Sequence, residues 1–135
     1  MAQQKIITVS THGKGLYLIT PKLLEGLDLP KTGLLNCFIP HTSASLVIQE
    51  NADPTAKADL EEFLNRLAPD DDDWYSHTAE GPDDSTSHLK AALLPTSLSI
   101  PIVNGSLALG TWQGVYIWEH RDAPHTRKII VTIAS

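Results

Sequence analysis

Near both ends of the chain, hydrophobic residues alternate with polar residues in the period of two that is typical of β-strands with one buried face. Residues 5–10 and 16–19 lie on either side of a turn with two glycines, which predicts an N-terminal β-hairpin. A continuous apolar run at 34–39 is suited to a buried strand. The dipeptide Asn104-Gly105 favours a tight hairpin turn. Further strands are predicted at 97–103, 106–109, 112–119 and 127–134.

The middle of the chain instead carries hydrophobic residues three and four positions apart, which is the spacing of an amphipathic helix. The longest such segment runs from Pro54 to Leu67, with Asp53 as its N-cap and a proline at its first position. We expect this helix to pack on a sheet. A second helix is predicted over residues 86–94, where the acidic pair at 83–84 supplies the cap.

A short helix is also predicted at Thr20-Pro21, with the threonine as its cap. Strands at both ends and two main helices in the middle indicate an α+β fold rather than a doubly wound one. We therefore predict that residues 1–135 form a single α+β domain with mixed or antiparallel sheets.

Composition narrows the classes of partner. The chain has 135 residues, 41% of them hydrophobic, which is typical of one globular domain. Its net charge of -6 argues against nucleic acid or an anionic membrane as a partner. No apolar stretch approaches the ~18 residues that a membrane helix needs, and no signal-peptide pattern precedes residue 5, so we expect a cytoplasmic protein. The single cysteine, Cys37, is expected to be a core thiol in a reducing compartment.

Histidines and carboxylates gather at the predicted ends of helices and strands. Asp84 and His88 are four residues apart at a helix start, so both project from one face. Such a pair either only caps and stabilises the helix or belongs to a site. Imidazole together with carboxylate suits zinc or a similar divalent ion, although the spacing is not that of a known zinc motif. The other members of this group are His41, Glu50, Asp53, His77 and Asp83.

Two other kinds of chemistry are weighed on the same segments. The hydroxyl groups at 42–45 adjoin His41, but no Gly-x-Ser-x-Gly elbow accompanies them, which disfavours serine hydrolysis. The helix starts at Asp53 and at 83–84, with Arg121, His125 and Arg127 nearby, could hold a phosphate. Their own carboxylates would repel that anion, and a bound divalent metal would reverse the repulsion.

Several of these motifs together resemble the YjbQ-type family, the secondary thiamine-phosphate synthases. The resemblance covers essentially the whole chain, in order and with similar spacing. It implies an α+β domain that forms a homotrimer, with sites near subunit boundaries. It also implies a reaction that joins hydroxymethylpyrimidine diphosphate to thiazole phosphate and releases diphosphate. The matching segments are 41–46, 50–54, His77 with 80–84, 87–90, 109–114, 119–121 and Arg127.

We therefore take a metal-assisted transferase of the thiamine-phosphate synthase type as the first hypothesis. Its cofactor would be a divalent ion, zinc or magnesium, and its substrates small phosphorylated metabolites. A metal-dependent hydrolase of a small metabolite and a non-catalytic trimer that binds metal or ligand are the alternatives. The assigned roles are metal or phosphate coordination by His41, His77, His88 and Asp84, electrostatic support by Glu50 and Asp53, and anion contact by Arg127.

Overall fold

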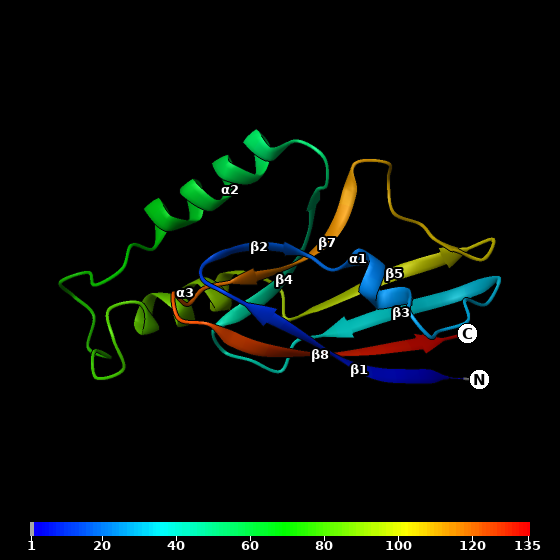
Figure 1. Cartoon of the computed structure of the whole chain (residues 1–135), viewed down its shortest axis with the longest axis horizontal. Coiled ribbons are helices and arrows are strands. Elements are labelled where there is room, and N and C mark those ends of the chain that lie inside the picture. The colour runs from blue at the N-terminus through cyan, green and yellow to red at the C-terminus, as the bar shows by residue number, and fades with distance from the viewer. Residues whose placement is uncertain (1) are drawn as a thin grey trace.

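Two antiparallel β-sheets and three helices build the protein, as a computed structural model that describes residues 2–135 shows (Figure 1). The α+β fold class and the single domain are as predicted. In chain order the elements are β1 Gln3–Thr11, β2 Gly15–Leu18, α1 Thr20–Leu24, β3 Thr32–Phe38, β4 Ala44–Glu50, α2 Pro54–Leu67, α3 Asp84–Leu93, β5 Ser97–Val103, β6 Ser106–Leu107, β7 Gln113–Glu119 and β8 His125–Ala134.

The larger sheet has the strand order β1-β8-β3-β5-β6, and every neighbouring pair is antiparallel. The central strands alternate, as the sequence predicts: in β8 the side chains of Ile129, Val131 and Ile133 are fully buried. At the β5–β6 turn Asn104 and Gly105 both have positive φ, 50° and 80°, which confirms the predicted hairpin. The termini lie together at one end of this sheet (Figure 1).

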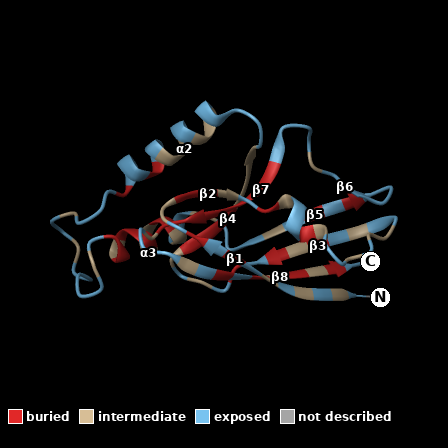
Figure 2. Cartoon of the chain, viewed as in Figure 1, coloured by how far each residue is buried: buried red, intermediate tan, exposed pale blue. Residues whose placement is uncertain are grey.

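The smaller sheet has the order β2-β7-β4. Its central strand, β7, is buried from Gly114 to Glu119, and this strand carries the chain into the region of the candidate site (Figure 2). The strand β4 was not among the predicted elements. Its small and hydroxyl residues do not alternate between apolar and polar, so the period of two is missing from the sequence. Ala44, Ser45 and Leu46 are nevertheless all buried.

The predicted N-terminal hairpin is wrong. Strand β1 pairs with β8 in one sheet, whereas β2 pairs with β7 in the other. The intervening glycines turn the chain from sheet to sheet, with φ of 144° at Gly13 and 143° at Gly15. A Cβ at Gly15 would also collide with the Glu61 carboxylate. Strands β1 and β2 therefore enter different sheets and do not pair with each other.

The helices differ from prediction in their packing and caps. Every residue of α2 is described, and among them Leu64 alone is buried, while Phe63 and Leu67 are exposed (Figure 2). The expected packing of α2 on a sheet is thus confined to one stripe. Thr20 does not cap α1; its hydroxyl accepts a hydrogen bond from the Val115 amide instead. Asp53 does cap α2, accepting from the Thr55 amide at 2.8 Å.

Cys37 lies in the core as expected, and burial raises the pKa of its thiol to about 11. Within residues 2–135 no helix is long and apolar enough to cross a membrane.

Candidate metal centre

Three side chains bring their ligand atoms together beside α3. Single ligand atoms of His77, Asp84 and His88 all lie within 4.8 Å of one another. The Oδ2 atom of Asp84 is 2.5 Å from Nε2 of His77 and 3.1 Å from Nε2 of His88. The two imidazole rings are 5.4 Å apart between centroids. The carboxylate is buried, whereas both imidazoles are partly exposed.

The chain assembles this cluster from one helix and one loop. Asp84 and His88 share a face of α3 because they are one helical turn apart. His77 comes from the irregular segment between α2 and α3. The ends of that segment are held by a hydrogen bond from the Asp71 amide to the Pro82 carbonyl, 2.9 Å long. The closed loop returns His77 to the start of α3.

A backbone carbonyl orients His88 for coordination. Its Nδ1 lies 2.9 Å from the carbonyl oxygen of Thr42, an atom that can only accept. Nδ1 therefore carries a proton, so Nε2, which lies beside Asp84 Oδ2, is the nitrogen that could bind a metal ion in place of its own proton; metal-ligating histidines are generally oriented in this way. Ligand atoms about 2.0–2.2 Å from a tetrahedral zinc ion lie about 3.3–3.6 Å apart. The observed separations of 2.5 and 3.1 Å are hydrogen-bond distances and are shorter than this spacing, so the three side chains would move apart slightly to surround a divalent cation.

Arg121 holds the other oxygen of the carboxylate. Its Nη1 donates to Asp84 Oδ1, and its Nε donates to Asp83 Oδ2 at 3.1 Å. Burial raises the pKa of Asp84, but the His77 hydrogen bond and the charges of His88 and Arg121 outweigh it, so the pKa lies below its ordinary value. Asp83 accepts from Arg121 and from the Asp122 amide, so its side chain does not cap α3 as predicted.

A pocket of about 430 Å³ adjoins the cluster and shares His88 with it. His41 lies in the wall of this pocket but outside the group of three ligands. Its Nε2 accepts a hydrogen bond from the Lys128 amide at 2.9 Å. Burial, followed by the charge of Arg127, lowers the pKa of His41 below its ordinary value. The pocket is lined by His41, Thr42, His88, Ala91, Ala92 and Thr96.

Arg127 is buried in an ion pair with Glu119. The Nε atom donates to Glu119 Oε1 at 2.7 Å, and Nη2 donates to Glu119 Oε2 and to the Ser43 hydroxyl, the latter at 3.0 Å. The same carboxylate accepts from the Thr11 hydroxyl at 2.6 Å. With its guanidinium buried and its Nε and Nη2 donors engaged, Arg127 tethers β8 to β7 and to Ser43 ahead of β4.

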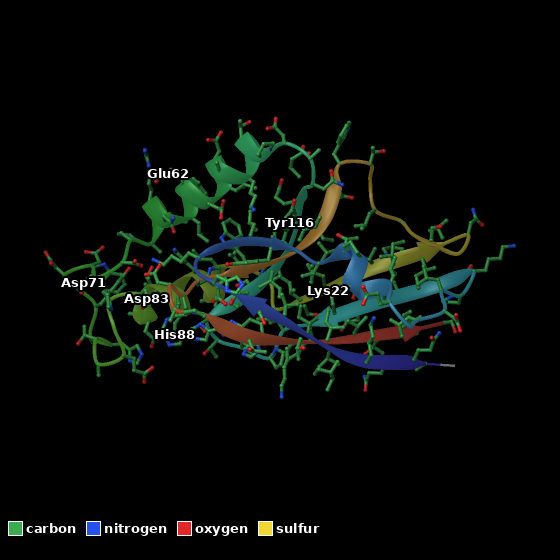
Figure 3. The ribbon with its side chains drawn as sticks, viewed as in Figure 1. Lys22, Glu62, Asp71, Asp83, His88 and Tyr116 are labelled. Atoms are coloured by element: carbon green, nitrogen blue, oxygen red, sulfur yellow. The ribbon has the colours of Figure 1, made fainter. Side chains whose placement is uncertain are left out.

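Glu50 and Asp53 lie in a different place from the histidine cluster. They line a separate pocket of about 320 Å³ that also includes Tyr116. Figure 3 shows Tyr116 well apart from His88 and Asp83, which lie near each other. Glu50 accepts from the Ala52 amide at 3.1 Å, and Asp53 caps α2. The structure thus brings together His77, Asp84 and His88, places His41 in the adjoining pocket, and separates Glu50 and Asp53 from all four.

Sequence reasoning gave no site role to His120 or Lys90, and it considered Arg121 only as a candidate phosphate contact. Arg121 orients Asp84, and the fully buried His120 lies 2.9 Å from the Ser45 hydroxyl through its Nε2. Lys90 is also buried, with its Nζ 2.6 Å from Asn65 Oδ1. The available signal was the charged triplet at residues 119–121, which directly follows the apolar strand.

The fold and the site together define an α+β protein of two antiparallel sheets with a histidine–carboxylate cluster at a helix start. Residues 5–135 match the family described as UPF0047 protein YjbQ-like. The UPF0047 protein sll1880 of Synechocystis sp. is 49% identical over 133 residues, covering 97% of this chain and 90% of that protein. The UPF0047 protein YjbQ of Escherichia coli O157:H7 is 43% identical over 136 residues, covering 98% of each chain. The chain belongs to the YjbQ-like UPF0047 family.

Solved structures show the same fold. The conserved hypothetical protein TT1486 from Thermus thermophilus superimposes with a TM-score of 0.84 at 36% identity, covering 93% of this chain and 97% of that one. The hypothetical protein APE1520 from Aeropyrum pernix gives a TM-score of 0.87 at 28% identity, covering 98% of each. None of the names of these four similar proteins states a reaction.

Proposed function

We propose that this protein is a divalent-metal-dependent enzyme whose metal ion is held by His77, Asp84 and His88. The observation that carries the proposal is the convergence of Asp84 Oδ2 and two imidazole Nε2 atoms within 4.8 Å of one another. Two histidines and one carboxylate form a donor set typical of catalytic zinc, which retains an open coordination position. The partial exposure of both imidazoles beside a pocket supports access of a substrate to that position.

The reaction we propose is transfer of the thiamine-phosphate synthase type, as the sequence resemblance implies. A bound divalent cation would supply positive charge against a departing diphosphate. The chain's own residues orient this centre: Thr42 fixes the His88 tautomer, and Arg121 holds Asp84 ionised and in place. In this reaction the thiazole nitrogen is the nucleophile, so no activated serine or cysteine is needed.

A metal-dependent hydrolase is the second candidate, and the lining of the pocket favours it. Among the described residues that line the pocket there is no lysine or arginine. The two phosphorylated substrates of the transferase would therefore find anion contacts at the metal centre but not in the pocket lining. A smaller ester or amide would need fewer such contacts.

The homotrimer implied by the resemblance is also part of the proposal. Exposed apolar side chains support association: Trp74, Leu93 and Leu67 are 68%, 63% and 57% exposed and line one hollow. Contiguous exposed apolar surface is typical of interaction sites.

Metal binding is the first test. Purified protein should bind one zinc or magnesium ion per chain by isothermal titration calorimetry after chelator treatment. His88→Ala and Asp84→Asn should each weaken binding by at least the about 10–100-fold that loss of a ligand's hydrogen-bond partner costs, because each change removes a ligand itself. His12→Ala, a change of an exposed turn histidine, is the matched control and should bind as the wild type does. Equal affinity in all four proteins would remove the proposed centre.

Turnover is the second test and separates the candidates. Formation of thiamine phosphate from the two phosphorylated substrates, present in the wild type with metal and lost in His88→Ala, is the result expected for the transferase. Silence in that assay with metal-dependent cleavage in an ester and amide panel would favour the hydrolase. Metal retention with no turnover in either assay would favour the non-catalytic binding trimer.

A further inference from the structure

We propose that His41 is a neutral hydrogen-bond donor that orients the substrate, offering Nδ1–H to an acceptor atom on a ring-sized, mainly apolar part of the ligand. The ligand part would occupy the pocket of about 430 Å³ beside the metal centre. This inference rests on the proposed function, because that pocket gains its importance from the cluster with which it shares His88. The proposed role of His41 differs from the metal or phosphate coordination that the sequence analysis assigned to it.

The hydrogen bond from β8 determines the tautomer of His41. The Lys128 backbone N–H can only donate, and it lies 2.9 Å from His41 Nε2. An imidazolium has no acceptor nitrogen, so this contact requires the neutral ring with its lone pair on Nε2. The single ring proton must then be on Nδ1. Burial and the charge of Arg127 lower the pKa of His41, which agrees with a neutral ring.

The Nδ1–H group of His41 is free to serve a ligand. Among the described residues 2–135, no hydrogen-bond partner faces this atom, whereas the corresponding Nδ1 of His88 is bonded to the Thr42 carbonyl. Among the described residues, the one side-chain polar atom that is both fully buried and without a partner is Nδ1 of His120. Nδ1 of His41 also lacks a partner, so it is not fully buried. A partly exposed ring in a pocket wall thus presents one uncommitted donor.

The rest of the lining describes what the donor would meet. The pocket wall, which includes Ala91 and Ala92, is mainly apolar, and lysine and arginine are absent from the described lining. Small-molecule sites are typically apolar, with a few polar groups that fix orientation. The occupant best matched to this wall is an uncharged ring that carries a nitrogen or carbonyl acceptor. Any anionic group on the same molecule would be directed to the metal centre.

The tautomer can be observed directly. In protein labelled with ¹⁵N-histidine at pH 7, long-range ¹H–¹⁵N correlation should show His41 as the Nδ1–H tautomer, with its signals assigned by their loss in His41→Asn. An Nε2–H tautomer or an imidazolium at that pH would overturn the inference.

Pyrimidine and benzene are suitable probes, since they have the same size and differ in ring acceptors. Titrated into metal-free protein, pyrimidine should bind and shift the His41 signals. The ratio of pyrimidine to benzene affinity should fall about 2- to 10-fold in His41→Phe, the range expected for one net hydrogen bond. His41→Asn places an amide N–H near the former Nδ1 position and should keep the ratio within about 2-fold of the wild-type value. Absence of pyrimidine binding, or an unchanged ratio in His41→Phe, would overturn the inference.

Zinc affinity separates this inference from the proposed function. His41→Phe should bind zinc as the wild type does, with its fold checked by thermal melting. A loss as large as that of His88→Ala would make His41 a metal ligand and overturn the inference while leaving the metal centre standing. Failure of the wild type to bind either zinc or magnesium would instead remove the proposed function. The His41 tautomer and the ratio of pyrimidine to benzene affinity would still test the inference about His41.

Discussion

At the scale of single residues, burial of ionisable groups controls how the stability of this protein depends on pH. His120 is fully buried at the end of β7, and burial, followed by the charge of Lys90, lowers its pKa to about 3. The unfolded chain protonates this imidazole near its ordinary value of 6.5, whereas the folded protein does not. Between these two values the unfolded state binds the additional proton, so stability falls as the pH falls.

We therefore predict that the free energy of unfolding decreases between pH 6.5 and pH 5 with a His120 contribution of up to about 1.4 kcal/mol per pH unit. His120→Asn removes the titrating group, so its unfolding free energy should have a flatter slope in this window. Urea titrations at half-unit pH steps measure both slopes. Carboxylates contribute little here because they titrate mainly below pH 5, at about 4 in unfolded chains. Parallel slopes for the two proteins would contradict the neutral burial of His120.

Arg121 shows how one residue can position another. Its guanidinium contacts both Asp83 and Asp84, so it holds the carboxylate that bridges the two histidines. We predict that Arg121→Ala weakens zinc binding about 10–100-fold, the typical effect of removing a partner of a metal ligand. Arg121→Lys should recover only part of that affinity, because lysine keeps the positive charge but lacks the paired donors of the guanidinium. Calorimetric titration with zinc measures both variants, and Arg66→Ala, an exposed arginine of α2, is the control.

At the scale of elements, α2 is held by few contacts. Leu64 is its buried side chain. Glu61 also accepts a hydrogen bond from the Leu16 amide, and Asn65 accepts one from Lys90. We predict that Leu64→Ala lowers the free energy of unfolding by about 2–5 kcal/mol, because a cavity replaces a core contact.

The matched control for α2 is Glu62→Ala, one turn from the exposed Arg66 with which Glu62 pairs. Exposed pairs of this kind contribute about 0.3–0.5 kcal/mol, so the control should change stability little. Denaturant unfolding monitored by circular dichroism compares the two variants. Equal losses would show that α2 is attached through its polar bonds rather than through Leu64.

At the scale of the whole molecule, exposed apolar side chains favour association of chains. The homotrimer would have a mass of about 44 kDa, which is three times the chain mass of 14.7 kDa. Light scattering after size-exclusion chromatography should give this value for the wild type. Leu93→Asp should reduce it because a charge enters the exposed apolar hollow, whereas Val103→Asp, beside the β5–β6 turn, should not. A wild-type mass of one chain would contradict the trimer.

Local pattern was sufficient for most strands and for both main helices. Alternation identified β5, β7 and β8, and the Asp53-Pro54 start located α2, because these signals depend on neighbours within a few residues. Apart from the β5–β6 hairpin, whose turn residues are local, the pairing of strands could not be obtained in this way. Strands β1 and β2 adjoin in sequence and lie in different sheets, since each one's partners come from the far end of the chain.

The same division holds for the site. The sequence alone identified Asp84 and His88 as one helical face and marked His77 as a related residue, because residue type and spacing carry that chemistry. Only the tertiary structure brought His77 onto Asp84, buried Arg127 against Glu119, and separated Glu50 and Asp53 from the cluster. Those outcomes depend on contacts between residues far apart in the chain, and no local pattern records which distant partner will satisfy a buried charge.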